Sequence, residues 1–313
     1  MSSAPARAHA PRPELVSVER PMLGGRVGIH LRAATPDHLE VARAASRTLD
    51  RMETWAARLT RFDPQSELSR LNASPTTTVA IGPTLGAVLD WARAAEAATD
   101  GVVDAALLDQ RLAAEAGAAA LLPAHRRWSL LRGPRRTILE RGSGVRFDLD
   151  GIAKGWLADR AACLLEGLAA VAIDADGDVA VRLDSGESLP LGVADPANPG
   201  MDLAIIQLRN DTPVRQDYGV ATSGTTIHRW GTGQAARHHL IDPRTGGPAS
   251  TDLVQATIVA TSARLAEAFA KTAVIVGLDA APRALRRPGI LGGLLLTDDR
   301  RSVTLPGTER FVA

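Results

Sequence analysis

The sequence predicts an α+β fold, and three observations support this prediction. Apolar residues recur at helical spacing through the first half of the 313-residue chain, whereas short apolar runs typical of strands dominate the second half. Helices and strands do not alternate strictly, as they would around a parallel sheet. No segment repeats with a period of roughly 20 to 50 residues, which excludes a solenoid.

The sequence predicts a flexible leader over residues 1–20, which are rich in Ala, Pro, Arg and Ser, and one domain over residues 21–313. Alternating apolar and polar residues predict a strand at 26–33. Thr35 followed by Pro36 predicts the start of a helix that ends at Leu59. Further elements are expected as a short segment at 66–72, helices at 83–98, 105–120 and 152–167, and strands at 136–140 and 145–149.

The second half is expected to be mostly strands, because its apolar runs are short and are separated by turn residues. One long helix is predicted at 263–276. The expected strands are 171–173, 179–183, 189–193, 204–208, 219–222, 253–260, 290–296 and 302–305.

Composition and charge exclude several classes of protein. Lys and Arg number 36 against 35 Asp and Glu, so the net charge is +1 and the basic field of a nucleic-acid-binding protein is absent. No apolar stretch approaches the roughly 18 residues of a membrane helix, and the N-terminus lacks the apolar region of a signal peptide, so we expect a cytoplasmic protein without a membrane segment.

Cys163, the single cysteine, lies in an apolar run and is expected to be buried. Only two basic residues are lysines, Lys154 and Lys271.

The segment Asp148–Gly155 (DLDGIAKG) is the first candidate site. A predicted strand ends here, a glycine turns the chain, and a helix begins with Lys154 in its first turn. Free amide N–H groups and the positive end of a helix dipole suit a phosphate, and a lysine adds a point charge. The pattern matches neither common phosphate-binding glycine motif, so a solvated lysine at a helix start stays an equal alternative.

The segment His238–Gly246 (HHLIDPRTG) is the second candidate. Two histidines and an aspartate in a turn offer a general base or metal ligands. Adjacent side chains of an extended chain point to opposite faces, so at most one of the two imidazoles is expected to face a site. His228 belongs to no such cluster and is interpreted as a surface or packing residue.

Two further patterns in the sequence have simpler interpretations beside the functional ones. Asp174–Asp178 (DADGD) looks like the start of a calcium loop, but Val179 and Ser185 stand where such a loop needs Gly and a bidentate acid, so a turn between strands is expected. Glu267 and Lys271 are four residues apart on a predicted helix. They form either a surface ion pair of about 0.3 to 0.5 kcal/mol or, because their neighbours are almost all small and apolar, a pair that faces a site.

Five ordered segments carry a resemblance to a known family. They read SELSRLN at 66–72, DGVVD at 100–104, DLDGIAKG at 148–155, TSG at 222–224 and HLIDPRTG at 239–246, and the helix with Glu267 and Lys271 follows them. In this order they resemble the motifs of the ApbE family of FAD:protein FMN transferases. The resemblance extends over about residues 20–280.

The resemblance implies a fold and an activity. The fold would be the ApbE-like, T-fold-related α+β core, a single unit with FAD in a cleft. The activity would be that of an enzyme that transfers FMN from FAD to a Ser or Thr hydroxyl of an acceptor flavoprotein and releases AMP. Two other functions stay open: a FAD-binding protein without transferase activity, and a FAD pyrophosphatase that gives FMN and AMP.

The resemblance also implies functional residues. His239 would act as the catalytic base beside the pyrophosphate, because a near-neutral imidazole pKa suits that task. Lys154 and Asp148 would contact FAD, and Phe62 stands where the family often has a tyrosine. The full set implied to bind FAD is Met22, Phe62, Val102, Val103, Asp104, Asp148, Lys154, Ser223, His239 and Leu240.

Two departures from the family pattern matter. The family's Met-Gly-Thr becomes MLGG at 22–25. The family holds Mg²⁺ with a helix Asp and Thr and a backbone carbonyl, and these positions are Glu267, Lys271 and Gly151 here. Magnesium needs oxygen ligands, and an ammonium has no lone pair. We therefore expect Lys271, paired with Glu267, to take the place of the metal and to be a second catalytic residue; alternatively Lys271 swings away and Mg²⁺ binds through Glu267 and the carbonyl.

Overall fold

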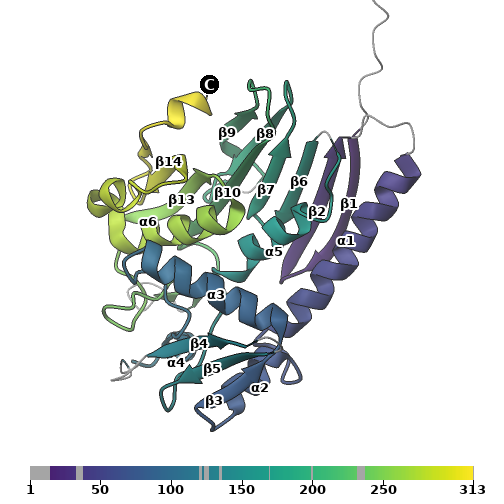
Figure 1. The fold of residues 1–313 in the computed structure, drawn as a ribbon. Helices are drawn as coiled ribbons and strands as arrows, with labels where there is room; N and C mark the ends of the chain where they lie inside the picture. Colours follow the sequence, from purple (N-terminus) through teal and green to yellow (C-terminus); the bar gives the residue numbers. More distant parts are fainter. Residues whose placement is uncertain are drawn as a thin grey trace, which may run out of the picture.

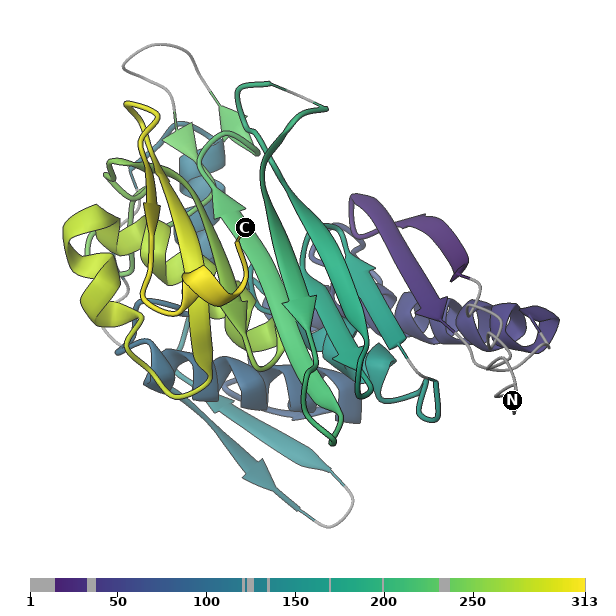
Figure 2. The ribbon, with the colours of Figure 1, turned by 90° about the horizontal axis from the view of Figure 1, so that it is seen from above.

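The computed structural model describes residues 15–32, 38–119, 122, 127–133, 136–168, 170–198, 200–230 and 237–312. Its main body is one eight-stranded antiparallel sheet (Figures 1 and 2). In spatial order the strands are β1 (Leu15–Met22), β2 (Gly25–Arg32), β6 (Ala170–Ala175), β7 (Val179–Leu183), β10 (Gln216–Gly224), β13 (Leu253–Ala260), β14 (Ile290–Thr297) and β15 (Ser302–Thr304).

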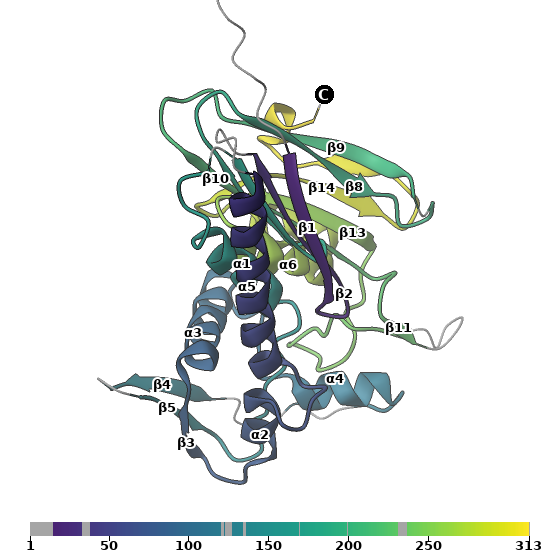
Figure 3. The ribbon, with the colours of Figure 1, turned by 90° about the vertical axis from the view of Figure 1, so that its right-hand side faces the viewer.

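The sheet is covered on both faces (Figure 3). Helices α1 (His38–Leu59), α5 (Ala153–Ala162) and α6 (Ala263–Ala284) pack on one face, and the hairpin of β8 (Ser188–Ala194) and β9 (Asp202–Arg209) lies over the other. Strand β6 contributes to the core on each face: Val171 and Ile173 join the core beneath α1 and α5, whereas Ala170 and Ala172 join the core beneath the hairpin. Because strand side chains alternate between the two faces of a sheet, an apolar run of this kind is buried on both faces.

A smaller part lies beyond the helices, at the lower side of Figure 1. It contains a three-stranded sheet and three helices, and its core is continuous with that of α1 and α5. These elements are α2 (Glu67–Ala73), β3 (Thr78–Ile81), α3 (Pro83–Ala98), α4 (Leu108–Glu115), β4 (Trp128–Arg132) and β5 (Thr137–Arg141). The remaining short elements are β11 (Arg229–Trp230), β12 (Arg237–His238) and the 3₁₀-helix η2 (Thr308–Arg310).

The α+β prediction is confirmed, and most predicted elements are present. The helix at 83–98 and the strands at 179–183 and 253–260 have the predicted bounds. The predicted turn at Asp174–Asp178 connects β6 to β7. The helices predicted at 105–120 and 152–167 are shorter, and the last long helix continues past a kink at Gly277.

Three predictions were wrong. Strand β1 begins at Leu15, inside the expected leader, because it pairs along its whole length with β2. Residues 145–149 form no strand, because the amides of Phe147 and Asp148 bond the Asn72 side chain and the Ala105 carbonyl in place of a neighbouring strand. Cys163 is exposed at the C-terminal end of α5.

Helices α5 and α6 cross at Gly155, where no side chain fits. A Cβ atom at this position would lie 2.6 Å from Arg264 Cα and 2.7 Å from the Ala263 carbonyl carbon. The close crossing brings the backbone of α5 to the side chains of α6, and the Gly155 amide donates a hydrogen bond of 2.9 Å to Glu267 Oε2. The spacing of Lys154 from Glu267 and Lys271 therefore depends on this glycine.

We predict that Gly155→Ala forces α5 and α6 apart and lowers the free energy of unfolding by about 1 to 3 kcal/mol, the usual cost of overpacking a core. Urea unfolding measures the change. Gly247→Ala is the control, because its added Cβ would meet no atom closer than 3.9 Å. Equal stability of the two variants would contradict the tight crossing.

Candidate functional site

A cavity of about 760 Å³ opens between the two parts of the molecule. Its walls are the β1–β2 turn, the C-terminal half of α1 with the segment after it, helix α4, and the start of α5. Of the residues implied by the family resemblance, Met22, Phe62, Asp148 and Lys154 line it. Its size is in the range of pockets that hold small molecules and cofactors.

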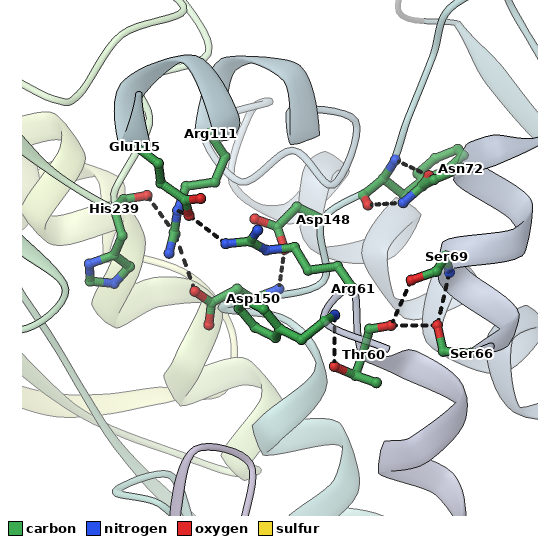
Figure 4. A network of polar contacts seen from close by, with 12 residues as sticks. Thr60, Arg61, Ser66, Ser69, Asn72, Arg111, Glu115, Asp148, Asp150 and His239 are labelled. Atoms are coloured by element: carbon green, nitrogen blue, oxygen red, sulfur yellow. Dashed lines mark hydrogen bonds and ion pairs between the residues drawn. The ribbon is translucent and has the colours of Figure 1, made fainter. Parts of the chain in front are cut away.

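Asn72 fixes the acidic segment that forms the cavity floor. Its side-chain amide donates to the Phe147 carbonyl and accepts from the Phe147 amide, both at 2.8 Å (Figure 4). This pair of bonds replaces the missing strand partners of residues 145–149 and sets the direction in which Asp148 leaves Phe147. Gly151, at φ +82°, then turns the chain into α5.

The two serines of the 66–72 motif shape the loop after α1. Ser66 caps α2 by accepting a bond from the Ser69 amide at 2.9 Å, and its own hydroxyl donates to the Thr60 carbonyl at 2.5 Å. Ser69 donates to the same carbonyl at 3.4 Å. The loop is held so that Arg61 faces the cavity (Figure 4).

Two arginines and a glutamate that the sequence interpretation missed form a network of polar contacts at the cavity wall. Glu115 accepts from Arg111 Nε at 2.7 Å and is ion-paired with Arg61. Arg111 Nη1 also donates to Asp150 Oδ2 at 3.2 Å and to the His239 carbonyl at 3.1 Å. Nothing in the spacing of these residues marks them, because their positions come together only in the folded chain.

The charges of the two cavity aspartates differ. Burial and the nearby Asp150 carboxylate raise the pKa of Asp148 above its usual value. Burial also disfavours the charged form of Asp150, but nearby positive groups, led by Arg111, lower its pKa to about 2. Asp150 is therefore the fixed negative charge of the pair.

His239 is the imidazole that faces the site, as predicted for one of the two adjacent histidines. His238 is turned away, and its Nε2 bonds the Ala249 carbonyl at 3.0 Å. The ring of His239 packs edge-on against that of His228, with 5.4 Å between ring centroids. His228 is exposed and packs on the ring of the candidate base, in line with its interpretation as a surface or packing residue, and it also lines the large cavity.

His239 does not have the near-neutral pKa expected of it. Burial lowers its pKa to about 3, and Arg111 and Lys271 add to the shift against the opposing effect of Asp150. Its Nδ1 is buried and has no hydrogen-bond partner among the described residues. The imidazole is therefore neutral and is a weak base in the unliganded cavity.

Lys271 reaches the turn between Asp150 and Gly151. Its ammonium donates to the Asp150 carbonyl at 3.2 Å, and a Cβ on Gly151 would lie 3.0 Å from Nζ. Glu267 points elsewhere, to the Gly155 amide, and no ion pair joins it to Lys271. The expected direct pairing of Lys271 with Glu267 was therefore wrong, because each side chain bonds the α5 turn at a different place.

Glu267 lies in a second buried charge cluster. It is 2% exposed, and burial raises its pKa to about 7. Burial and the charge of Glu267 raise the pKa of Asp178 well above its usual value. Lys154 lies beside these acids and pairs with Asp176 at 2.8 Å; burial alone would lower the pKa of Lys154, but Asp178 and Asp176 outweigh it and raise the pKa. Lys154 is therefore a permanent cation at the cavity wall.

A small pocket of about 20 Å³ adjoins the large cavity. Arg111, Asp148 and Asp150 line both, so they stand at the junction. Two residues implied by the resemblance, Val102 and Asp104, lie here with His239 and Lys271.

The other implied residues are not at either wall. Val103 and Leu240 are buried in the core, and Ser223 lies on β10, where it pairs with Ala256.

The residues at the family's metal position do not fit Mg²⁺. Among the residues that the structure describes, no three His, Cys, Asp or Glu side chains come together in a group that could hold a metal ion. The family's Thr oxygen is replaced by the Lys271 ammonium, which has no lone pair for a metal. The Lys271 ammonium lies at the Gly151 turn, and a second cation in that space would be repelled.

Comparison with known proteins decides the family. The sequence profile described as "ApbE family" matches residues 23–292. The chain belongs to the ApbE family. It is 30% identical over 190 residues to the FAD:protein FMN transferase of Treponema pallidum, a match that covers 56% of this chain and 51% of that protein. It is 28% identical over 145 residues to the enzyme of the same name from Escherichia coli K12, covering 46% and 40%. The chain thus matches about half the length of these relatives.

Solved ApbE structures share the fold. The ApbE protein of Thermotoga maritima superposes with a TM-score of 0.78 at 20% identity and covers 96% of this chain and 100% of that one. The flavin transferase ApbE of Vibrio cholerae gives a TM-score of 0.72 at 20% identity, covering 96% and 99%. The predicted ApbE-like fold is confirmed. None of the helices in the described part of this ApbE chain is both long and apolar enough to cross a bilayer.

We predict that the His239 imidazole of this ApbE protein stays neutral between about pH 5 and pH 8. Lys271→Met should raise its pKa, because one of the cations that oppose the imidazolium is removed. NMR titration of the ring protons measures both, and the other histidines of the chain serve as references. A wild-type midpoint between about pH 6 and pH 7, as for a solvated imidazole, would contradict the burial argument.

Proposed function

We propose that this protein transfers FMN from FAD to a Ser or Thr hydroxyl of an acceptor flavoprotein and releases AMP. The observation that carries the proposal is the convergence of Asp148, Asp150, Lys154 and His239 on connected cavities in a chain of the ApbE family. The names of the relatives in Treponema pallidum and Escherichia coli support the same activity.

The proposed reaction is a phosphoryl transfer. The acceptor oxygen forms a bond to the phosphorus of the FMN half, the bond from that phosphorus to the bridging oxygen breaks, and AMP leaves with the bridging oxygen. His239 is the proposed base for the proton of the acceptor hydroxyl, because its Nδ1 is unpaired among the described residues. The negative charge of a bound pyrophosphate would raise its pKa from about 3 toward the range that suits a base. Lys154 supplies a positive charge to the pyrophosphate.

Lys271 is proposed to replace the family's Mg²⁺. Its ammonium bonds the backbone turn at Asp150 and Gly151, and its charge faces the small pocket with His239. It would offset the negative charge that develops on the pyrophosphate during transfer. The alternative, in which Lys271 swings away from a metal, is less compatible with this contact.

Hydrolysis of FAD to FMN and AMP is a second candidate. The small pocket of about 20 Å³ has room for about one water molecule beside His239. Water there would replace the acceptor hydroxyl with the same base and the same leaving group.

We expect an acceptor flavoprotein incubated with this protein and FAD to gain the mass of FMN minus water, with one AMP released per acceptor. Mass spectrometry and AMP chromatography measure the two products. His239→Ala should lower the rate at least about a hundredfold, the usual contribution of a general base. AMP release without acceptor would favour hydrolysis. Absence of both products with the flavoproteins encoded beside this gene would rule out the proposed chemistry.

We expect the wild-type activity to be unchanged by excess chelator, because the Lys271 ammonium occupies the Gly151 turn and would repel a metal cation there. The double variant Lys271→Thr, Glu267→Asp restores the oxygen ligands of the family and should become dependent on Mg²⁺. Activity against Mg²⁺ concentration, with and without chelator, measures this. Wild-type activity abolished by chelator would contradict the replacement of the metal by Lys271.

A further inference from the structure

Two buried arginines at the cavity have no part in the chemistry proposed above. The side chain of Arg111 is 7% exposed and that of Arg61 is 11% exposed. A guanidinium stays charged when it is buried, so its donors need acceptors from the protein or from a ligand. Which donors lack an acceptor therefore indicates what the site is built to bind.

Arg111 is held on one side and open on the other. Nε bonds Glu115 at 2.7 Å, and Nη1 bonds Asp150 and the His239 carbonyl at 3.2 and 3.1 Å. Nη2 has no hydrogen-bond partner in the described part of the chain, and the side chain lines both cavities. The guanidinium carbon lies 5.1 Å from the centroid of the Trp230 ring, within the range of a cation–π contact.

Arg61 approaches Glu115 from the other side (Figure 4). Its Nε is buried without a hydrogen-bond partner among the described residues and lies 3.9 Å from Asp148 Oδ1, too far for a hydrogen bond. Its guanidinium lies over the Phe62 ring, with 4.3 Å to the centroid. Glu115 is thus the shared counter-ion of two guanidinium groups, each with an unused donor.

We propose that Arg61 and Arg111 form an anion site that takes a phosphate group of the flavin nucleotide. The inference rests on the proposed function in taking FAD as the ligand. Guanidinium groups match phosphate oxygens with two parallel hydrogen bonds, and two of them on one carboxylate leave a concave set of donors. The Asp150 contact, at 3.2 Å, is longer than the about 2.7 to 2.9 Å of a strong charge-assisted bond. Asp150 is therefore the partner of Arg111 that a phosphate oxygen displaces.

Flavin binding tests the site separately from catalysis. FAD carries the phosphates and riboflavin does not, so the ratio of their dissociation constants isolates phosphate recognition. Arg111→Gln and Arg61→Gln should each weaken FAD at least about tenfold, the loss expected of one charge-assisted hydrogen bond. Riboflavin should bind within about twofold of wild type in all variants. Quenching of flavin fluorescence gives both constants.

Matched variants separate binding from a structural role. Arg146→Gln is the control, because Arg146 pairs with Asp109 of α4, the helix that carries Arg111, and does not line the cavities. Glu115→Gln should tighten FAD, since both guanidinium groups lose their counter-ion, whereas a purely structural network predicts a loss in this variant too. Thermal melting checks that each variant folds; if Arg111→Gln does not, Arg61→Gln decides.

The proposal is overturned if the two arginine variants keep the wild-type ratio of FAD to riboflavin affinity, if Glu115→Gln weakens FAD, or if wild type binds FAD no better than riboflavin. Inorganic pyrophosphate should compete with FAD in wild type and about tenfold less well in the arginine variants. Phosphate-dependent binding without AMP release would leave this site standing and refute the transferase and hydrolase reactions. AMP release with an unchanged ratio of FAD to riboflavin affinity would refute the anion site and leave the proposed reactions standing.

Discussion

The site depends on keeping the carboxylates of Asp148 and Asp150 together in a partly buried segment. A buried carboxylate costs several kcal/mol unless cations and hydrogen-bond donors surround it. Here the cations come from different parts of the chain: Arg61 from the loop after α1, Arg111 from α4 and Lys271 from α6. The two acids thus bring these separate elements to one place, and their own ionisation differs because Arg111 compensates one more strongly than the other.

The fold meets this requirement by fixing the segment at both ends. Asn72 binds the backbone just before Asp148, and the crossing of α5 and α6 at Gly155 fixes the backbone just after Lys154. Between them the Gly151 turn exposes the carbonyl of Asp150 to Lys271. The site therefore lies where the large sheet with its helices meets the smaller part of the molecule, and neither part forms it alone.

Much of this could be predicted from the sequence, because local patterns carried it. Helix 83–98 has a proline at its start and helical spacing, and the strands after residue 170 follow their apolar runs. The ordered motifs indicated Asp148, Lys154 and His239, which do face the cavities. What could not be predicted depends on distant partners. Residues 145–149 alternate like a strand, but the Asn72 side chain bonds their backbone in place of a neighbouring strand. Nothing in the sequence around Arg111 indicates that it bonds Asp150 and His239, which lie 39 and 128 positions further along the chain.

The division of labour between lysine and arginine follows from shape. The chain has two lysines among 36 basic residues, and both lie at this site. Lys271 packs against the Gly151 turn, where an added Cβ would lie 3.0 Å from its Nζ, and it donates to the Asp150 carbonyl. Its compact ammonium resembles a bound ion more than a planar guanidinium does. Arg61 and Arg111 occupy the wider cavity wall, where a fork of several donors can bond Glu115 on one side and still leave donors free on the other. Lys271 thus places a point charge at the small pocket, whereas Arg61 and Arg111 place directional donors where a phosphate has several oxygens to bind.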